Sequence, residues 1–303
     1  MTDPYAERRA VARAAYLEAC ELELRAFKPG NVGLHAEGHG MTVADFRLSA
    51  AASAPCLCDP ALPLGERIFH AIAATRRVVA CNTNLGIVLL AAPLILAFET
   101  QAPGEPLRRA VTRVLAGTTR ADAEWVYRAI RLAEPGGLGQ VPEQDVGSAP
   151  TASLQEVMGL AAGRDRIAYQ YTNSFSDIFD HAIPSYHTAL SRWGAEEWAA
   201  VAVFVSLLKR FPDSHVERKF GTRYTGMIAE RMARLERALS ESPEPKRVVG
   251  LLREVDTEFK RWGVNPGTTA DLTVACLLAA RLGGLPDLGR GNHVLPLPVK
   301  EFC

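Results

Sequence analysis

The sequence has no excess of charge of either sign. Among its 303 residues, 34 are basic and 34 are acidic, so the formal net charge at neutral pH is zero. Proteins that bind nucleic acids or membrane surfaces usually carry a basic patch, and we therefore expect neither partner. A small anionic ligand is compatible with this composition, because a local site needs only a few lysine or arginine side chains.

Long hydrophobic runs are also missing. The longest, residues 85–98, covers fourteen positions and is interrupted by Gly86 and Pro93, whereas a helix needs about 20 apolar residues to span a bilayer. The first residues are polar and lack the apolar segment of a signal peptide. The six cysteines, at positions 20, 56, 58, 81, 276 and 303, form no Cys-x-x-Cys pair. We therefore expect a cytoplasmic protein with reduced thiols and no membrane contact.

Several familiar motifs of nucleotide-binding proteins and hydrolases are absent. The sequence contains no Gly-Lys-Ser/Thr motif, no Gly-x-Ser-x-Gly motif and no aspartate-rich prenyl-diphosphate motif. Gly136, Gly137 and Gly139 do not follow a predicted strand, so they do not indicate a dinucleotide-binding fold. His35 and His39 lie in a glycine-rich loop without an evident third ligand, which argues against zinc.

Apolar side chains recur at helical spacing along most of the chain, and no sustained apolar–polar alternation indicates a strand. Residues 85–98, and the stretch that follows 265–271 up to 282, are apolar on all sides, which predicts buried helices. The sequence thus predicts an all-α fold, a single multi-helix globular domain over residues 1–303 with buried apolar helices. The other predicted helices are residues 5–26, 42–54, 64–79, 105–116, 121–133, 152–162, 164–173, 178–193, 195–210, 222–240 and 244–262.

Three segments have a distinct character. Residues 135–150 form the longest stretch rich in glycine and proline, and a mobile loop or lid is predicted there. The tail from about residue 283 is predicted to be irregular. The helix predicted at 222–240 is strongly amphipathic, and its apolar face can join either the core or a second copy of the chain, which leaves a homodimer open.

Residues 28–45 form a loop with four glycines between two predicted helices. The loop is longer than the roughly 2–8 residues that helix connections need, and glycines such as Gly30 allow the backbone to approach a ligand closely. Lys28 and Asn31 are able to bind an anion. We therefore predict that this loop forms one wall of a phosphate and metal site.

Four polar segments share the same position relative to a helix. Residues 28–45, 82–86, 213–219 and 265–271 each lie at or just before a predicted helix N-terminus. Such termini present unpaired N–H groups and the positive end of the helix dipole, and they bind phosphates well. Carboxylates at the same positions can hold Mg²⁺, which binds through oxygen ligands and substrate phosphates. If the four termini converge, they form a site for a Mg²⁺-nucleotide polyphosphate.

Each segment also has a purely structural interpretation. Thr42 with Asp45, and Thr268 with Asp271, have the spacing of helix-capping pairs, and the two asparagines of 82–86 are suited to cap the next helix. Residues 213–219 can be a solvated first helical turn. Asp271 is harder to explain as a cap, because it is the only charge between positions 265 and 281. A buried carboxylate needs hydrogen-bond donors or a cation.

Four motifs, in chain order, resemble those of the triphosphoribosyl-dephospho-CoA synthase family. The similarity extends roughly from residue 10 to residue 282. One such motif alone would be weak, whereas four in register are specific. They are Lys28-Pro-Gly-Asn-Val, Asn82-Thr-Asn-Leu-Gly, Asp213-Ser-His-Val-x-Arg-Lys and Asn265-Pro-Gly-Thr-Thr-Ala-Asp-Leu.

The resemblance implies an all-α enzyme, a triphosphoribosyl transferase that joins ATP to 3′-dephospho-CoA with Mg²⁺. In such a reaction the 2′-hydroxyl of the acceptor displaces adenine at the anomeric carbon, and the triphosphate stays intact. The product is the precursor of the prosthetic group of citrate or malonate lyase-type enzymes. The displacement needs a clamp on the triphosphate, nearby anions and an acid that protonates the departing adenine.

The resemblance also implies roles for residues of the four motifs. Asp213 and Asp271 are expected to hold Mg²⁺ or to flank the ribose. Asp45, His215 and Asp271 are the candidate catalytic groups for proton transfer. The expected ligands of the substrate and its phosphates are Lys28, Gly30, Asn31, Asn82, Asn84, Arg218, Lys219, Asn265 and Thr268.

The chain departs from the pattern of members that make the lyase cofactor. They carry Thr-His-Lys-Gly where this chain has Thr83-Asn-Leu-Gly, and Asp-Thr-Asn-Val where it has Asp213-Ser-His-Val. The chain looks more like the branch found in archaea and methylotrophic bacteria, which is associated with pterin- or furan-type one-carbon carriers. Two alternatives therefore stay open: a related transfer or condensation in the biosynthesis of such carriers, and a non-catalytic nucleotide-binding protein.

Overall fold

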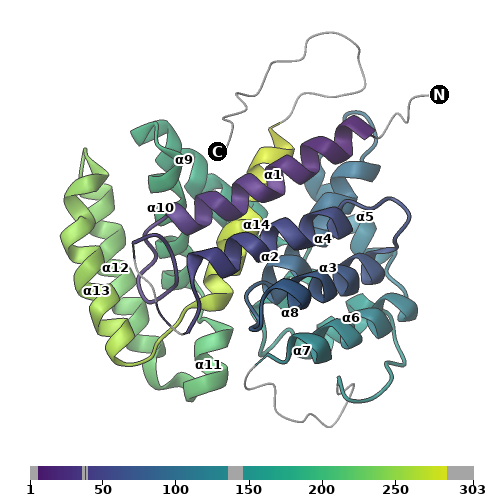
Figure 1. The fold of residues 1–303 in the computed structure, drawn as a ribbon. Helices are drawn as coiled ribbons and strands as arrows, with labels where there is room; N and C mark the ends of the chain where they lie inside the picture. The colour runs from purple at the N-terminus through teal and green to yellow at the C-terminus, as the bar shows by residue number, and fades with distance from the viewer. Residues whose placement is uncertain (1–5, 36–37, 39, 136–145, 285–303) are drawn as a thin grey trace.

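The computed structural model describes residues 6–35, 38, 40–135 and 146–284, and over these residues the protein is built from helices (Figure 1). This part of the chain contains no strand, and an isolated antiparallel bridge joins Gly38 and Met41. The predicted all-α fold is confirmed. No helix among these residues is long and apolar enough to cross a membrane, and the cytoplasmic location stays a prediction.

The helices follow the predicted segments closely. A π-helical turn, Asp177–Ala182, leads into α9, and 3₁₀ turns at Gly221–Tyr224 and Pro245–Val248 lead into α12 and α13. In chain order the α-helices are α1 (Ala6–Arg25), α2 (Val43–Leu57), α3 (Leu64–Val78), α4 (Leu85–Thr100), α5 (Leu107–Ala116), α6 (Arg120–Ala133), α7 (Leu154–Ala161), α8 (Arg166–Thr172), α9 (Ile183–Trp193), α10 (Glu196–Arg210), α11 (Ser214–Phe220), α12 (Thr225–Glu241), α13 (Val249–Arg261) and α14 (Gly267–Gly283).

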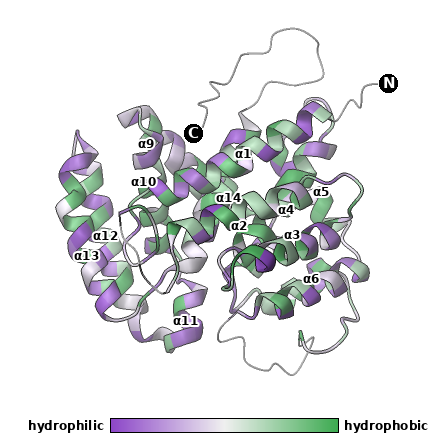
Figure 2. Cartoon of the chain, viewed as in Figure 1, coloured by the Kyte–Doolittle hydropathy of each residue, from purple (hydrophilic) through white to green (hydrophobic). Residues whose placement is uncertain are grey.

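Two uniformly apolar helices, α4 and α14, lie at the centre of the molecule. In α4 every residue except Leu96 and Thr100 is buried, and most of α14 between Thr268 and Leu282 is buried as well. The two helices pack against each other, and α14 also contacts α1 and α10. Helices that are apolar on all sides must be covered on all sides, and the prediction of buried apolar helices is confirmed (Figure 2).

The remaining helices surround this pair. On one side α2 packs against α1 and α3, and α3 packs against α6; on the other side α12 packs against α10, with α13 beside it at the edge of the molecule (Figure 1). The buried apolar side chains from Ala12 to Leu282 form one continuous cluster. A continuous core supports the predicted single-domain organisation, which stays a prediction. The apolar face of α12, including Met232 and Leu235, is buried in this core, which is one of the two roles left open for it, and the homodimer stays open.

Helix α11 was not among the predicted helices, most boundaries shift by one to five residues, and proline is involved in two of the differences. Helix α2 continues through Pro55 to Leu57, because a proline in the last turn removes only one intrahelical hydrogen bond. The segment before Pro184 forms a π-turn in which the Ile183 N–H donates to the Ile178 carbonyl. The predicted lid at 135–150 and the predicted irregular tail fall largely on residues 136–145 and 285–303, which lie outside the described residues.

Candidate active site

The four polar segments meet at one cavity of about 350 Å³. Each segment contributes at least one lining residue: Asn31 from the first, Asn82 from the second, His215 from the third and Asn265 from the fourth. The cavity lies where the N-terminal ends of α4, α8, α11 and α14 come together. The predicted convergence of polar helix starts is therefore present in the fold.

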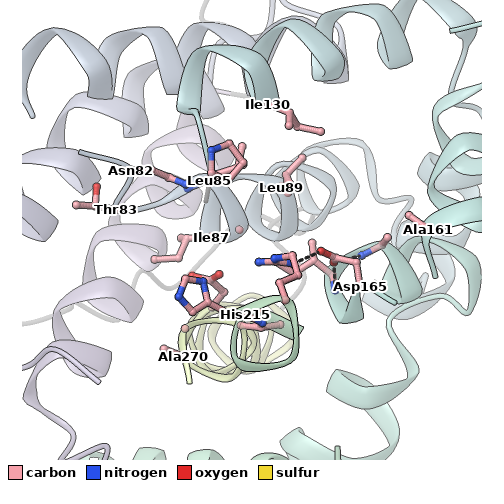
Figure 3. A pocket seen from close by; sticks show the side chains of 18 of the residues that line it. Asn82, Thr83, Leu85, Ile87, Leu89, Ile130, Ala161, Asp165, His215 and Ala270 are labelled. Carbon is pink, nitrogen blue, oxygen red and sulfur yellow. Dashed lines mark hydrogen bonds and ion pairs between the residues drawn. The ribbon is translucent and has the colours of Figure 1, made fainter. Parts of the chain in front are cut away.

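The cavity has a polar side and an apolar side. Figure 3 shows Leu85, Leu89 and Ile130 on one side and His215 opposite them. Further apolar lining comes from α7 and α8, and the charged lining comes from Glu23, Arg164, Asp165, Arg218 and Asp271. A site of this kind can hold a ligand that combines an apolar or aromatic part with charged groups.

Asp271 is the central carboxylate of the cavity. It lies in the second turn of α14, and its Oδ2 would be only 2.0 Å from a Cβ at Gly86 on α4. No described residue donates a hydrogen bond to it. Burial raises its pKa well above the ordinary value, and the negative charges of Glu23 and Asp213 raise it further. The raised pKa makes this carboxyl group a good acceptor for a proton from a bound ligand.

Thr268 and Asp271 do not form the helix cap that their spacing allows. Helix α14 starts after Pro266 without a side-chain cap. Instead, Thr268 Oγ1 accepts a hydrogen bond of 3.2 Å from the backbone N–H of His215. This bond joins α11 to α14, and it brings His215 to the cavity beside Gly267, whose Cβ would lie 3.6 Å from the imidazole.

The loop of residues 28–45 is connected to α14 by a hydrogen bond between two asparagines. Asn31 Nδ2 donates to Asn265 Oδ1 over 2.8 Å. Both side chains are largely buried and both line the cavity. Their second amide atoms are available to a ligand, which fits the predicted role of Asn31 and Asn265 in substrate binding.

Arg218 is the cation that the structure places in the cavity from the 213–219 segment. Its Nη1 donates to Asp165 Oδ2 over 2.7 Å, and Asp165 also caps α8 by accepting from the Ile167 and Ala168 N–H groups. The Arg218 Nε is buried without a partner. Lys219, predicted as an alternative clamp, is exposed and lies near the Gly263 carbonyl and the Phe220 ring instead. It does not line the cavity.

The two asparagines of 82–86 have different surroundings. Asn82 lines the cavity, and its Oδ1 accepts from the Leu85 N–H at the start of α4. Asn84 is buried, and its Nδ2 donates to Thr75 Oγ1 and approaches Ser49 O. Its side chain is therefore part of the interior and does not line the cavity, so the predicted substrate contact by Asn84 is not supported.

Lys28 and Gly30 are also turned away from the cavity. The Lys28 side chain is 0% exposed, 3.0 Å from Glu23 Oε1, and it donates to the Val32 carbonyl. Gly30 has a φ of 82°, and a Cβ there would come within 2.8 Å of the Val264 carbonyl. Both residues fold the loop tightly onto neighbouring helices, and the arrangement does not support a direct contact with phosphate.

Asp45 has the structural role that its spacing from Thr42 predicts. It forms a capping box with Thr42, and its Oδ2 accepts from the Thr42 N–H and hydroxyl over 2.8 Å each. These hydrogen bonds lower its pKa, whereas a proton donor at neutral pH needs a raised one. Asp45 does not line the cavity, so the predicted catalytic role is not supported.

Asp213 is engaged on both oxygens. Oδ1 accepts from the Val216 N–H as the N-cap of α11, and Oδ2 accepts from the N–H and the hydroxyl of Thr269. It therefore joins α11 to α14 through both carboxylate oxygens. The described residues contain no cluster of three metal-ligating side chains. The role of Asp213 and Asp271 as metal ligands stays a prediction.

Several lining residues were not singled out from the sequence. Glu23 is an acidic residue among apolar neighbours on a predicted helix, and Asp165 lies in a charged turn between two apolar helices. Neither charge is isolated in the sequence, since Glu23 has Glu21 and Arg25 two positions away and Asp165 lies between Arg164 and Arg166, so no local pattern marks them. Gly86 and the apolar wall carried no signal, because their meaning depends on which helix packs against them.

Comparison with known proteins agrees with the four motifs. A family model described as ATP:dephospho-CoA triphosphoribosyl transferase matches residues 8–288. The chain belongs to this family. Among solved structures, it is similar to the crystal structure of an Archaeoglobus fulgidus protein provisionally described as a triphosphoribosyl-dephospho-CoA synthase. The TM-score is 0.61 at 25% identity, and the match covers 78% of this chain and 98% of that one. A search of curated proteins found no match.

Membership of the ATP:dephospho-CoA triphosphoribosyl transferase family confirms the resemblance and identifies the chain as a transferase of cofactor biosynthesis. It argues against the non-catalytic alternative. All four motifs of the family contribute residues to the same cavity.

Proposed function

We propose that the chain transfers the triphosphoribosyl group of ATP to the 2′-hydroxyl of 3′-dephospho-CoA and releases adenine. The acceptor oxygen forms a bond to the anomeric carbon C1′ while the C1′–N9 bond breaks, and its electron pair leaves with adenine. The acceptor loses one proton and adenine gains one, so the reaction is balanced. The family match and the similar archaeal structure support this proposal.

The observation that carries the proposal is the position of Asp271. It faces the cavity without a hydrogen-bond donor from any described residue. Displacement at C1′ passes through a transition state with positive charge on the ribose ring. A nearby carboxylate stabilises that charge and can accept the proton of the incoming hydroxyl. Asp271 thus supplies a negative charge and a proton acceptor beside the reacting carbon.

The polar side of the cavity is suited to the triphosphate. The first turn of α14 faces the cavity on this side, and the positive end of its dipole favours phosphate. Arg218 adds a full positive charge with a donor, Nε, that has no hydrogen-bond partner among the described residues. Mg²⁺ enters as part of the Mg·ATP substrate, because this ion takes many of its ligands from phosphates and water. It neutralises phosphate charge.

His215 is the candidate donor to the departing adenine. It lines the cavity opposite the apolar wall, and an imidazole can carry a proton at neutral pH. The apolar wall, with Leu89 and Ile130, suits the adenine ring or the apolar arm of the acceptor.

Adenine release tests the proposal directly. The protein is incubated with Mg²⁺, dephospho-CoA and ATP labelled in its γ-phosphate, and the products are separated by chromatography. Free adenine together with label in a CoA-containing product supports the transfer. Folded protein that releases no adenine, or that frees the label as phosphate, contradicts it. Asp271→Asn is the matched control for contaminating activity.

One observation favours a second acceptor. Leu85 occupies the position at which lyase-cofactor members carry lysine, and it faces the cavity next to Ile87 and Leu89. This wall therefore adds no positive charge for a phosphorylated acceptor. The alternative function is a transfer or condensation from the same ATP site in the biosynthesis of pterin- or furan-type one-carbon carriers. Adenine release with a pterin- or furan-type acceptor, but not with dephospho-CoA, would select it.

A further inference from the structure

A second carboxylate faces the cavity from α1. Glu23 is 4% exposed, and it lines the same cavity as Asp271. Its Oε1 lies 3.0 Å from Lys28 Nζ. No described residue donates a hydrogen bond to its Oε2, and this atom is not sealed inside the protein. Oε1 is therefore paired with the Lys28 ammonium, and Oε2 is available to a ligand in the cavity.

Lys28 contacts Glu23 and does not line the cavity. Its side chain is 0% exposed, and Nζ also donates to the Val32 carbonyl over 2.8 Å. The backbone closes in on the ammonium, since a Cβ at Gly33 would lie 3.4 Å from Nζ. A cation shielded from water at this distance strongly favours the ionised form of the carboxyl group.

Glu23 and Asp271 have different electrostatic surroundings. Burial raises the pKa of Glu23, and the Lys28 ammonium opposes this rise. Burial also raises the pKa of Asp271, and the charge of Glu23 is the next largest cause. The titratable and charged groups around the pair include Cys20 on α1, Asp165 at the start of α8, Asp213 at the start of α11, and His215 and Arg218 on α11. Both pKa values are raised, but Glu23 has an ammonium in direct contact and Asp271 does not, so Glu23 is the better suited of the two to stay ionised and Asp271 to take up a proton.

We propose that Glu23 is a second catalytic carboxylate, a fixed anion beside the ribosyl carbon, and that Lys28 is its positioning residue. This inference rests on the proposed transfer from ATP. The hydroxyl oxygen bonds to C1′, the C1′–N9 electron pair leaves with adenine, the hydroxyl proton passes to Asp271, and adenine takes a proton from His215. Glu23 forms no covalent bond. Its charge stabilises the positive charge that develops on the ribose.

The molecule offers a matched control for the pair. Arg67 and Glu99 form another buried ion pair, with 2.7 Å between Nη1 and Oε2 and side chains only 3% and 7% exposed. Neither residue lines the cavity. Lys28→Met and Arg67→Met each leave one buried carboxyl group without its cation. Only Lys28→Met is expected to change the chemistry of Glu23.

The first measurement needs no substrate. Carbon-13 NMR follows the carboxyl groups of labelled glutamates in the full chain, and the spectrum of Glu23→Gln assigns the Glu23 signal. In Lys28→Met the Glu23 midpoint is expected to rise by roughly 1–3 pH units; in Arg67→Met it should stay at the wild-type value. An unchanged midpoint in Lys28→Met overturns the positioning role.

The second measurement is the pH profile of adenine release. Glu23→Gln is expected to lower kcat on the order of 10²- to 10³-fold, with a smaller change in KM for ATP. Lys28→Met should move the acidic limb of the profile to higher pH, and Arg67→Met should not. Near-wild-type kcat in Glu23→Gln overturns the catalytic role, and this variant decides if Lys28→Met does not fold. No adenine release by the wild type contradicts the proposed transfer instead, and the NMR titration still decides the pairing.

Discussion

Asp271 on α14 lies so close to Gly86 on α4 that a Cβ at Gly86 would come within 2.0 Å of Oδ2. Ile167 closes the same gap from α8, with its Cδ1 at 2.6 Å from that Cβ position. Because α4 and α14 pack directly against each other, only a residue without a side chain leaves room for the carboxylate. This contact fixes where the negative charge stands in the cavity.

Gly86→Ala should therefore displace the Asp271 carboxylate. We expect kcat for adenine release to fall by about 10²-fold, because a misplacement near 1 Å is enough for a loss of this size. Gly250→Ala is the matched control. Gly250 is also helical, in α13, but a Cβ there meets nothing within 4 Å, so this change should leave kcat unaltered and stabilise the helix by about 0.5–1 kcal/mol. Equal kcat in both variants would show that Asp271 is not held at Gly86.

Asp271→Asn should separate activity from stability. The folded-state pKa of Asp271 lies above the unfolded one, so the folded protein binds more protons, and the free energy of unfolding falls as pH rises above about 3.9. In the Asn variant the free energy of unfolding does not fall for this reason, because the amide does not titrate. We expect it to lose adenine release and to be more stable than the wild type at neutral pH, by a margin that grows from acid to neutral pH.

Urea unfolding of both proteins at several pH values measures this margin. A margin that is constant with pH would contradict a raised pKa. A variant that unfolds at every pH would assign Asp271 a structural role.

Arg218 and its neighbour Lys219 provide a direct comparison of two cations. Arg218→Met removes the charge in the cavity, and a hydrogen bond to a charged group contributes roughly 1.5–3 kcal/mol. KM for ATP should therefore rise on the order of 10- to 100-fold. Lys219→Met removes an exposed charge outside the cavity and should leave KM unchanged. Steady-state kinetics of both variants measures KM for ATP. A larger rise in KM for Lys219→Met than for Arg218→Met would assign the phosphate contact to Lys219.

Asp45→Ala should lower the stability of the fold and leave the catalysed reaction unchanged. The variant loses the capping box of α2, so its thermal midpoint at neutral pH should be lower, with adenine release per folded molecule unchanged. The pKa of Asp45 is lowered by the Thr42 hydrogen bonds, so its stabilisation is lost as pH falls through that lowered pKa. The difference in midpoint should vanish in acid. Lost activity with an unchanged midpoint would restore Asp45 as a catalytic candidate.

Much of the fold followed from the sequence because local patterns determine helices. The uniform apolarity of residues 85–98 predicted a buried helix, and α4 is one. The capping spacing of Thr42 and Asp45 predicted the start of α2, and the capping box is present. The predicted helix 42–54 ends before Pro55, whereas α2 continues to Leu57, because its packing against α3 outweighs the single hydrogen bond that proline removes.

The site was less predictable, because side-chain direction depends on contacts across the chain. The sequence placed Lys28 in a polar loop, where it was predicted to bind phosphate. The structure buries it against Glu23, five residues earlier. Asp213 and Asp271 looked equivalent as acidic residues at helix starts. Thr269 uses both its donors on Asp213, while no described residue donates to Asp271, and no local pattern distinguishes these cases.

The hydrogen bond between Asn31 and Asn265 joins positions 234 apart in the chain. The cavity therefore has no complete wall until the last described helix, α14, has been synthesised and has packed against α1 and α4. A nascent chain on the ribosome cannot use ATP to aid its own folding. Once the chain is complete, any ligand in the cavity connects its first and last helices, so the stabilisation by binding opposes global unfolding and not only local opening.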